Sequence, residues 1–266
     1  MKLAIYQGSG TASDVLANLT LLARVAEKAA NQGADFLVLP ELFLTGYNIG
    51  DDAWRLAEPK DGPLVRQTVK IAQDCKIAIL LGYCEVSEGR FYNSAVLIDR
   101  DGHLVANYRK IHLFGPEERR LFVPGNQWVV HPIAGIKVGM LICYDVEFPE
   151  AVRILAQKGA ELVAVPTALM VPSPQVPTSI EISKTLVPAR ALENQIFIAY
   201  VNRSGSEGDV AYCGLSRVVG PDGKELVRAG SESALLITEI DLSAIAKERS
   251  TYSYLDERRP ELYQNF

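Results

Sequence analysis

Cys143 stands where a short apolar run ends and an acidic turn begins, in the sequence KVGMLICYDVEFPE. Residues 137–142 are typical of a strand that is covered on both faces, and Pro149 suits the first turn of a helix. A thiol between a strand and a helix lies near unpaired N–H groups and the positive end of the helix dipole, which favour a thiolate and can bind an oxyanion. A lone cysteine is also a common core residue, so its partners decide between the two interpretations.

Two polar residues stand in comparable places elsewhere in the chain. Glu41 follows the apolar residues 36–39, and Lys110 follows an expected hairpin at 92–108 that turns at an Asp-Gly pair. Either residue alone is an ordinary capping or surface residue. Together with Cys143 they supply what a cysteine hydrolase requires, namely a nucleophile, a proton shuttle and a cation for the tetrahedral oxyanion.

The histidines do not complete a Cys-His pair. His103 belongs to the expected hairpin, His131 belongs to an expected strand, and His112 only follows Lys110 closely in the chain. A histidine base is therefore unsupported, and a glutamate is expected to take the proton of the thiol.

The composition is that of an ordinary globular protein, with 266 residues of which 48% are hydrophobic and 22% charged. No linker or charge block divides the chain, so residues 1–266 are expected to form a single domain, with 242–266 as a C-terminal tail that contacts another subunit. A net charge of −5 without a basic stripe argues against nucleic-acid binding. The chain shows neither a signal-peptide pattern nor a membrane-spanning apolar run, which favours a cytoplasmic protein without membrane contact. Its four cysteines are widely spaced and indicate neither a disulfide framework nor a zinc site.

One pattern occurs twice in the chain, since residues 33–40, GADFLVLP, are echoed by residues 159–166, GAELVAVP. Each copy is expected to be a helix end, a tight turn and a buried strand. This predicts two related α/β halves that deliver Glu41 and Thr167 to comparable places. Further strands are expected at 3–7, 76–82, 128–131 and 196–201, helices at 14–33, 64–75 and 179–194, and a polar loop at 111–125. Pro188 should kink or divide the last of these helices.

The sequence resembles the nitrilase superfamily of carbon–nitrogen hydrolases, which uses a Glu-Lys-Cys triad. The similar stretches cover nearly the whole chain: PELFLTGY around Glu41, YRKIHLFGPEE around Lys110, GMLICYDVEFPE around Cys143, and FYNSAVLID and ARALENQ in support. The resemblance implies an α/β fold, a four-layer αββα sandwich of two mixed sheets with helices outside. It also implies assembly into a homodimer or higher homo-oligomer, and activity without a metal or an organic cofactor.

Two details of the resemblance concern the site and the branch of the family. Many amidases of the family carry a second glutamate eight residues after the lysine, which here is Glu118, although Glu117 beside it leaves the assignment open. Cys143 is followed by Tyr144-Asp145, as in the amidase and carbamoylase branches, whereas true nitrilases have tryptophan and glutamate there. The YQG start, the FLTGYNIG loop and the HLFG segment are most similar to bacterial 5-aminopentanamidases.

The predicted function is therefore hydrolysis of the primary amide of a small aliphatic carboxamide, including an ω-amino carboxamide, to carboxylate and ammonia. A thioester on Cys143 is the expected intermediate, with Glu41 as base, Lys110 and the N–H of Tyr144 as oxyanion donors, and Glu118 orienting Lys110. The alternatives are hydrolysis of an N-carbamoyl amine or amino acid, ω-amidase action on a dicarboxylic acid monoamide, true nitrilase activity, and a binding protein that keeps the fold.

The substrate pocket is expected between residues 42–52 and 169–181. The candidate substrate-binding residues are Tyr47, Tyr144, Thr167, Ala168 and Met170. Both segments carry acids and neither carries Lys or Arg, so Asp51, Asp52 or Glu181 is expected to attract an ammonium group of the substrate.

Overall fold

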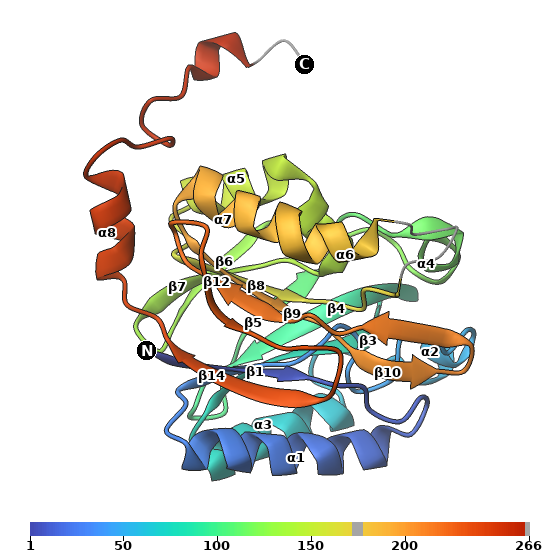
Figure 1. Ribbon diagram of the computed structural model, residues 1–266. Helices are drawn as coiled ribbons and strands as arrows, with labels where there is room; N and C mark the ends of the chain where they lie inside the picture. The colour runs from blue at the N-terminus through green and yellow to red at the C-terminus, as the bar shows by residue number, and fades with distance from the viewer. Residues whose placement is uncertain (172–177, 264–266) are drawn as a thin grey trace.

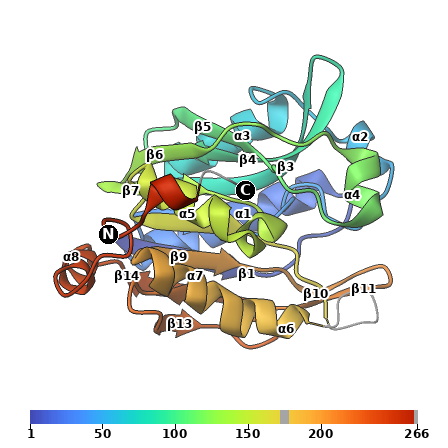
Figure 2. The same cartoon turned by 90° about the horizontal axis from the view of Figure 1, so that it is seen from above.

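The computed structural model describes residues 1–171 and 178–263. Two six-stranded sheets lie face to face, and helices cover the outer face of each (Figure 1). Helices α1 (Val15–Asn31) and α3 (Pro63–Cys75) cover the first sheet, and α5 (Pro149–Gln157) and α7 (Val187–Asn194) lie side by side over the second (Figure 2). The αββα sandwich predicted from the sequence is confirmed.

The first sheet has the strand order β14-β1-β2-β3-β4-β5. Its strands are β1 (Lys2–Gln7), β2 (Phe36–Val38), β3 (Ala78–Ser87), β4 (Arg90–Ile98), β5 (Leu104–Arg109) and β14 (Ala234–Glu239). Strands β1, β2 and β3 pair in parallel, while β14, β4 and β5 add to them in antiparallel fashion.

The second sheet has the order β13-β12-β9-β8-β7-β6. Its strands are β6 (Val129–Ile133), β7 (Ile136–Met140), β8 (Leu162–Pro166), β9 (Phe197–Val201), β12 (Arg217–Val219) and β13 (Glu225–Arg228). Strands β7, β8 and β9 are parallel, with one antiparallel strand beyond β7 and a hairpin beyond β9. The first sheet has the same plan around β1, β2 and β3, so the repeated sequence falls on the central strands β2 and β8 of two halves of matching topology.

The strands are apolar in continuous runs because each sheet is covered on both faces. Leu3 and Ile5 of β1 point into the core between the sheets, whereas Ala4 and Tyr6 pack toward the outer helices. A core shared by both sheets fixes how the two halves dock, and with it the relative position of the loops at the strand ends.

Shorter elements complete the fold: α2 (Asp52–Arg55), α4 (Gly115–Leu121), the 3₁₀ turn η1 (Cys143–Glu147), α6 (Ser179–Glu181), the π-helical turn η2 (Ile182–Leu186), the hairpin β10 (Ser204–Glu207) and β11 (Val210–Cys213), α8 (Ser243–Arg249) and the 3₁₀ turn η3 (Pro260–Leu262). The expected helix at 179–194 is divided, with Pro188 in the first turn of α7 where its missing N–H costs nothing. The loop predicted at 111–125 is wrong in its centre, because α4 forms there with glutamates in its first turn and arginines in its last.

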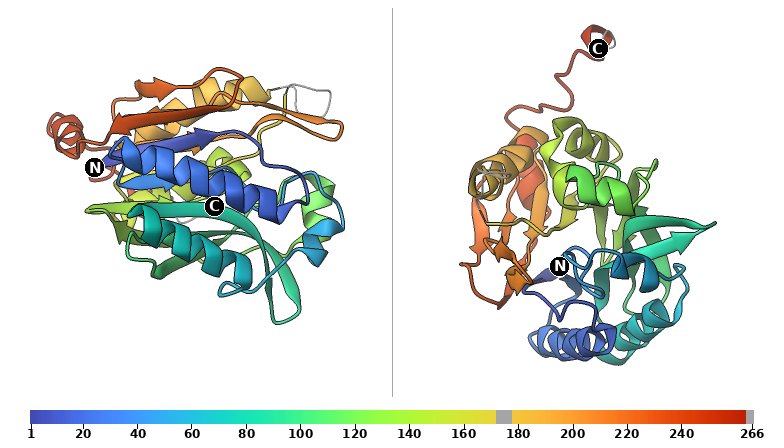
Figure 3. Two further views of the ribbon diagram at one scale, coloured as in Figure 1. Left: turned by 90° about the horizontal axis from the view of Figure 1, so that it is seen from below. Right: turned by 90° about the vertical axis from the view of Figure 1, so that its right-hand side faces the viewer.

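The C-terminal segment after β14 extends away from the body of the molecule (Figures 1 and 3). It is held at its base by Gln195, whose side-chain amide donates to the carbonyl oxygens of Glu248 (3.3 Å) and Tyr252 (3.0 Å) and accepts from the N–H of Tyr254 (3.3 Å). None of the helices in the described parts of the chain is long and apolar enough to cross a membrane.

Candidate active site

The chain reverses direction at Cys143. After β7 it stays extended through Ile142 (φ −129°, ψ 118°), and Cys143 itself has a φ of 46° as it opens the turn η1. A positive φ is uncommon for a residue with a side chain and is kept where the surrounding structure enforces it. This turn leaves the thiol half-buried on the wall of a cavity rather than inside the sheet.

Asp145 holds this turn in place. Its buried carboxylate accepts four hydrogen bonds: from the hydroxyl of Tyr108 (2.8 Å) and the N–H of Ile142 (3.0 Å) at Oδ2, and from the N–H and Nδ1 of His112 (both 2.8 Å) at Oδ1. The carboxylate thus ties the end of β7 to the segment after β5 and supports the strained Cys143.

Three charged side chains meet at the ends of the two sheets. The Nζ of Lys110, which follows β5, lies 2.7 Å from Oε1 of Glu41, which follows β2, and 2.7 Å from Oε1 of Glu118 in α4. All three are buried, with Lys110 and Glu41 fully excluded from solvent. Glu117 is exposed and pairs with Arg120 (2.6 Å), so the geometry selects Glu118 as the second glutamate.

Glu41 and Glu118 differ in the hydrogen bonds that their carboxylate oxygens accept. Oε1 of Glu41 also accepts from the amide of Asn93 (2.7 Å), but its buried Oε2 has no hydrogen-bond partner among the described residues. Oε1 of Glu118 also accepts from the hydroxyl of Tyr47 (2.7 Å), and its Oε2 accepts from the N–H of Phe114 (2.9 Å). Glu41 therefore keeps one oxygen available for a proton, whereas Glu118 uses both to hold its neighbours.

Burial and mutual charge set the protonation of the group. Burial raises the pKa of Glu41, although Lys110 opposes the shift. Burial acts to lower the pKa of Lys110, but the Glu118 and Glu41 carboxylates outweigh it and hold that pKa well above its usual value. Burial and then the Glu41 charge raise the pKa of the Cys143 thiol well above its usual value.

The raised pKa keeps the proton on the resting thiol, as expected for a thiol that a glutamate deprotonates. The turn η1 has only five residues and presents a weak dipole, which burial and the nearby carboxylate overcome. Lys110 stays an ammonium, and Glu41 lies near enough to Cys143 for its charge to act on the thiol.

A buried ion pair fixes the loop that carries Glu41. The guanidinium of Arg203 pairs with Glu207 and donates to the carbonyl oxygens of Glu41 (Nε, 3.0 Å) and Leu42 (Nη2, 2.7 Å). The other carboxylate oxygen of Glu207 accepts from the N–H of Tyr47 (2.9 Å). The hairpin β10–β11 is thereby locked onto the loop after β2.

A cavity of about 210 Å³ opens beside the thiol. Its described wall consists of Tyr47, Phe114, Cys143, Tyr144, Glu147, Ala168, Leu169, Met170, Thr178 and Ile182. The structure thus brings Tyr47, Tyr144, Ala168 and Met170 together with Cys143. Thr167 lies behind the wall, where its buried hydroxyl donates to the carbonyl of Val165 (2.9 Å) and its own carbonyl accepts from the N–H of Glu41 (3.4 Å).

Both segments predicted to form the pocket reach this wall, and residues 172–177 of the second lie outside the described residues. The acids predicted to attract an ammonium do not reach it. Asp51 pairs with Arg120 (2.7 Å) and Asp52 with Arg55 (2.9 Å) on the surface, and Glu181 is exposed on α6.

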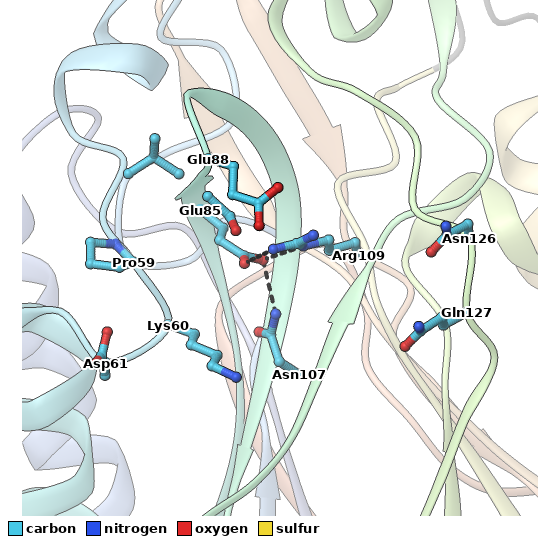
Figure 4. A pocket seen from close by; sticks show the side chains of 11 residues that line it. Pro59, Lys60, Asp61, Glu85, Glu88, Asn107, Arg109, Asn126 and Gln127 are labelled. Carbon is cyan, nitrogen blue, oxygen red and sulfur yellow. Dashed lines mark hydrogen bonds and ion pairs between the residues drawn. The ribbon is translucent and has the colours of Figure 1, made fainter.

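A second and larger cavity of about 500 Å³ lies beside the β3–β4 hairpin (Figure 4). There Asn107 (2.8 Å) and Arg109 (3.0 Å) point toward Glu85 and donate to it, so these three side chains bind one another. None of the groups around Cys143 lines it. Within residues 1–171 and 178–263, no cluster of three or more His, Cys, Asp or Glu side chains is arranged to hold a metal ion.

The sequence model of the carbon–nitrogen hydrolase family matches residues 2–249, and the chain belongs to this family. It is 38% identical to an (R)-stereoselective amidase from Pseudomonas sp., over 97% of this chain and 92% of that protein, and 34% identical to the 2-oxoglutaramate amidase of Bacillus subtilis, over 86% and 87%. Among solved structures, an amidase from Nesterenkonia sp. superposes with a TM-score of 0.89 at 37% identity, covering 100% of this chain and 95% of that one.

A variant of the amidase from Nesterenkonia sp. AN1, 36% identical, TM-score 0.89 and with 100% and 96% coverage, shows covalent addition of the acetamide moiety of fluoroacetamide at its active-site cysteine. These findings define the protein as a nitrilase-superfamily hydrolase that acts on amides.

The sequence did not single out several residues that contribute to the site, namely Asn93, Asp145, Glu147, Arg203 and Glu207.

Proposed function

We propose that the protein hydrolyses the primary amide of a small aliphatic carboxamide to carboxylate and ammonia, through a thioester on Cys143. The Oε2 of buried Glu41 has no hydrogen-bond partner among the described residues and lies near a thiol that keeps its proton, and this observation carries the proposal. It is the arrangement a general base requires before a neutral nucleophile attacks.

In the first half-reaction Glu41 takes the thiol proton as sulfur bonds to the carbonyl carbon. Lys110, whose Nζ is fixed by two carboxylates, and the N–H of Tyr144 hold the oxyanion. Glu41 returns the proton to nitrogen, the C–N bond breaks and ammonia leaves. In the second half-reaction Glu41 takes a proton from water as the oxygen bonds to the thioester carbon. The C–S bond then breaks, Glu41 returns the proton to sulfur, and the acid leaves and ionises to the carboxylate.

The cavity favours a small substrate. Its volume of about 210 Å³ accommodates an acyl chain of a few carbons, and Leu169, Met170 and Ile182 give it apolar contacts. The solved structure of a variant of the related Nesterenkonia amidase in complex with butyramide supports this size class.

Variants of the two glutamates and the cysteine test the proposal. Cys143→Ala should abolish ammonia release while leaving the melting temperature nearly unchanged. Glu41→Gln should block both half-reactions, whereas Glu118→Gln should still form some thioester, visible by mass spectrometry after incubation with butyramide. Full activity in Cys143→Ala, or a normal acyl adduct in Glu41→Gln with none in Glu118→Gln, would contradict the assigned roles.

A second candidate is ω-amidase action on a dicarboxylic acid monoamide, favoured by the similarity to 2-oxoglutaramate amidase. A substrate carboxylate calls for a cation in the pocket, and no Lys or Arg stands among the described wall residues. Measuring ammonia release from butyramide, glutaramate and N-carbamoyl-β-alanine decides between the candidate reactions.

We also propose that residues 242–266 mediate contacts between copies of a single-domain chain in the cytoplasm. Exposed aromatic side chains in this segment, Tyr252, Tyr254 and Tyr263, support it. Light scattering on the full chain and on a chain ending at Asp241 should show a smaller assembly for the shorter chain, and cell fractionation tests the location. Equal masses would contradict the proposed role of the segment.

A further inference from the structure

Glu147 places a carboxylate on the wall of the catalytic cavity. It ends the turn η1 that Cys143 begins, and residues three apart in a 3₁₀ turn share one side, which puts Glu147 above Tyr144 on the same wall. The rise of about 2 Å per residue separates the Cα atoms of Cys143 and Glu147 by about 8 Å along the turn. The turn therefore carries Glu147 away from the nucleophile along this wall.

Among the described residues, no Lys or Arg side chain forms an ion pair with the Glu147 carboxylate. Arg190 of α7 comes near, but its guanidinium donates to the carbonyl oxygens of Val146 (3.1 Å) and Glu147 (2.8 Å) and pairs with Glu193 (3.2 Å). Residues 172–177, PSPQVP, include no charged residue. A half-buried carboxylate without an ion-pair partner is costly unless a ligand supplies one.

We propose that Glu147 binds an ammonium group at the far end of the substrate, so that the preferred amides are ω-amino carboxamides. This inference rests on the proposed amidase function and names its substrate class. Leu169, Met170 and Ile182 would contact the methylene chain, and the ring of Tyr144 lies on the same wall as the carboxylate that receives the cation. The acids Asp51, Asp52 and Glu181, which lie outside the wall, take no part.

The charge of Glu147 should make the preference depend on pH. Burial raises the pKa of Glu147 to about 7, against the lowering effect of Lys110 at the end of β5 and Arg190 of α7. Tyr200 of β9 and Cys143 also face the site, and both keep their protons at neutral pH because their pKa values are raised. The carboxylate that attracts an ammonium therefore forms as pH rises through about 7, and the preference for amines should rise with it.

Two substrates of the same length isolate the contact. In 5-aminopentanamide an ammonium takes the place of the terminal methyl group of hexanamide. The wild-type protein should hydrolyse the amine with a kcat/KM higher by roughly tenfold or more at pH 8, as expected for one charge-assisted contact, and the ratio should shrink below pH 7. Glu147→Gln should bring the ratio close to one at every pH, and Glu147→Asp should keep part of it.

Glu181→Gln is the matched control, since it removes an exposed acid near the pocket and should leave the ratio unchanged. Equal slowing of both substrates by Glu147→Gln, with the ratio preserved, would show that Glu147 only supports the turn. A wild-type ratio of one or less, with hexanamide hydrolysed, would overturn the ammonium site and leave the amidase function standing. Failure of the wild-type protein to hydrolyse either amide or butyramide would instead overturn the proposed function and the inference with it.

Discussion

Asp145→Asn should destabilise the protein and slow it, although the substituted side chain has the same shape. An asparagine has one oxygen and one NH₂ group, so in either orientation the NH₂ faces a backbone N–H, that of His112 at one position or that of Ile142 at the other. The NH₂ group and the backbone N–H that faces it are then two donors without an acceptor between them.

The expected loss follows from these two donors. At about 1–3 kcal/mol for each buried group left unpaired, the free energy of unfolding should fall by about 2–6 kcal/mol. A loss of about 3 kcal/mol corresponds to a drop in Tm of roughly 6–12 °C for a chain of this size. Because Asp145 also supports the strained φ of Cys143, kcat/KM should fall by about 100-fold from displacement of the thiol.

Urea unfolding followed by fluorescence measures the first effect, and ammonia release from butyramide measures the second. Asp222→Asn is the control, because Asp222 also accepts a backbone N–H, that of Lys224 (3.1 Å), but does so in an exposed turn. That variant should change the free energy of unfolding by less than about 1 kcal/mol. If Asp145→Asn also changes the free energy of unfolding by less than about 1 kcal/mol and keeps a normal kcat/KM, Asp145 does not support the turn as described.

Three further predictions concern the neighbours of the site. Tyr47→Phe removes the 2.7 Å hydrogen bond to Glu118 and should lower kcat/KM about tenfold, with an unchanged value arguing that the bond is dispensable. Arg203→Met leaves Glu207 buried without its partner and should lower the free energy of unfolding by about 3–5 kcal/mol in urea, more than Glu207→Gln does; the reverse order would contradict the described ion pair. Alkylation of Cys143 by a thiol reagent that lacks an amide group should still accelerate between pH 8 and 10, because the raised pKa delays thiolate formation; a rate already level at pH 8 would indicate a resting thiolate.

The main chemical groups could be predicted from the sequence because they follow apolar runs. Buried strands are recognisable as such runs, and Glu41 and Cys143 each come at or just beyond the end of one. The repeated pattern at 33–40 and 159–166 also indicates two matching halves. The helix α4 escaped prediction because it is short and because Glu118, one of its two buried side chains, is polar.

The supporting groups could not be predicted, because their partners depend on how the two sheets dock. Arg203 bonds to the backbone of Glu41, which lies 162 positions earlier in the chain, and no local pattern reports such a contact. Glu147 could be taken for an ordinary residue of a turn. Only the positive φ of Cys143 and the course of η1 turn its carboxylate toward the cavity.

The matching halves have a consequence for when the protein becomes reactive. The first half carries Glu41 and Lys110, and the second half carries Cys143. They meet only after the two sheets have joined, when the N–H of Glu41 bonds to the carbonyl of Thr167. A chain in which only one half has formed therefore lacks the complete set of Glu41, Lys110 and Cys143. During refolding, amide hydrolysis should therefore recover later than the β-sheet signal in circular dichroism.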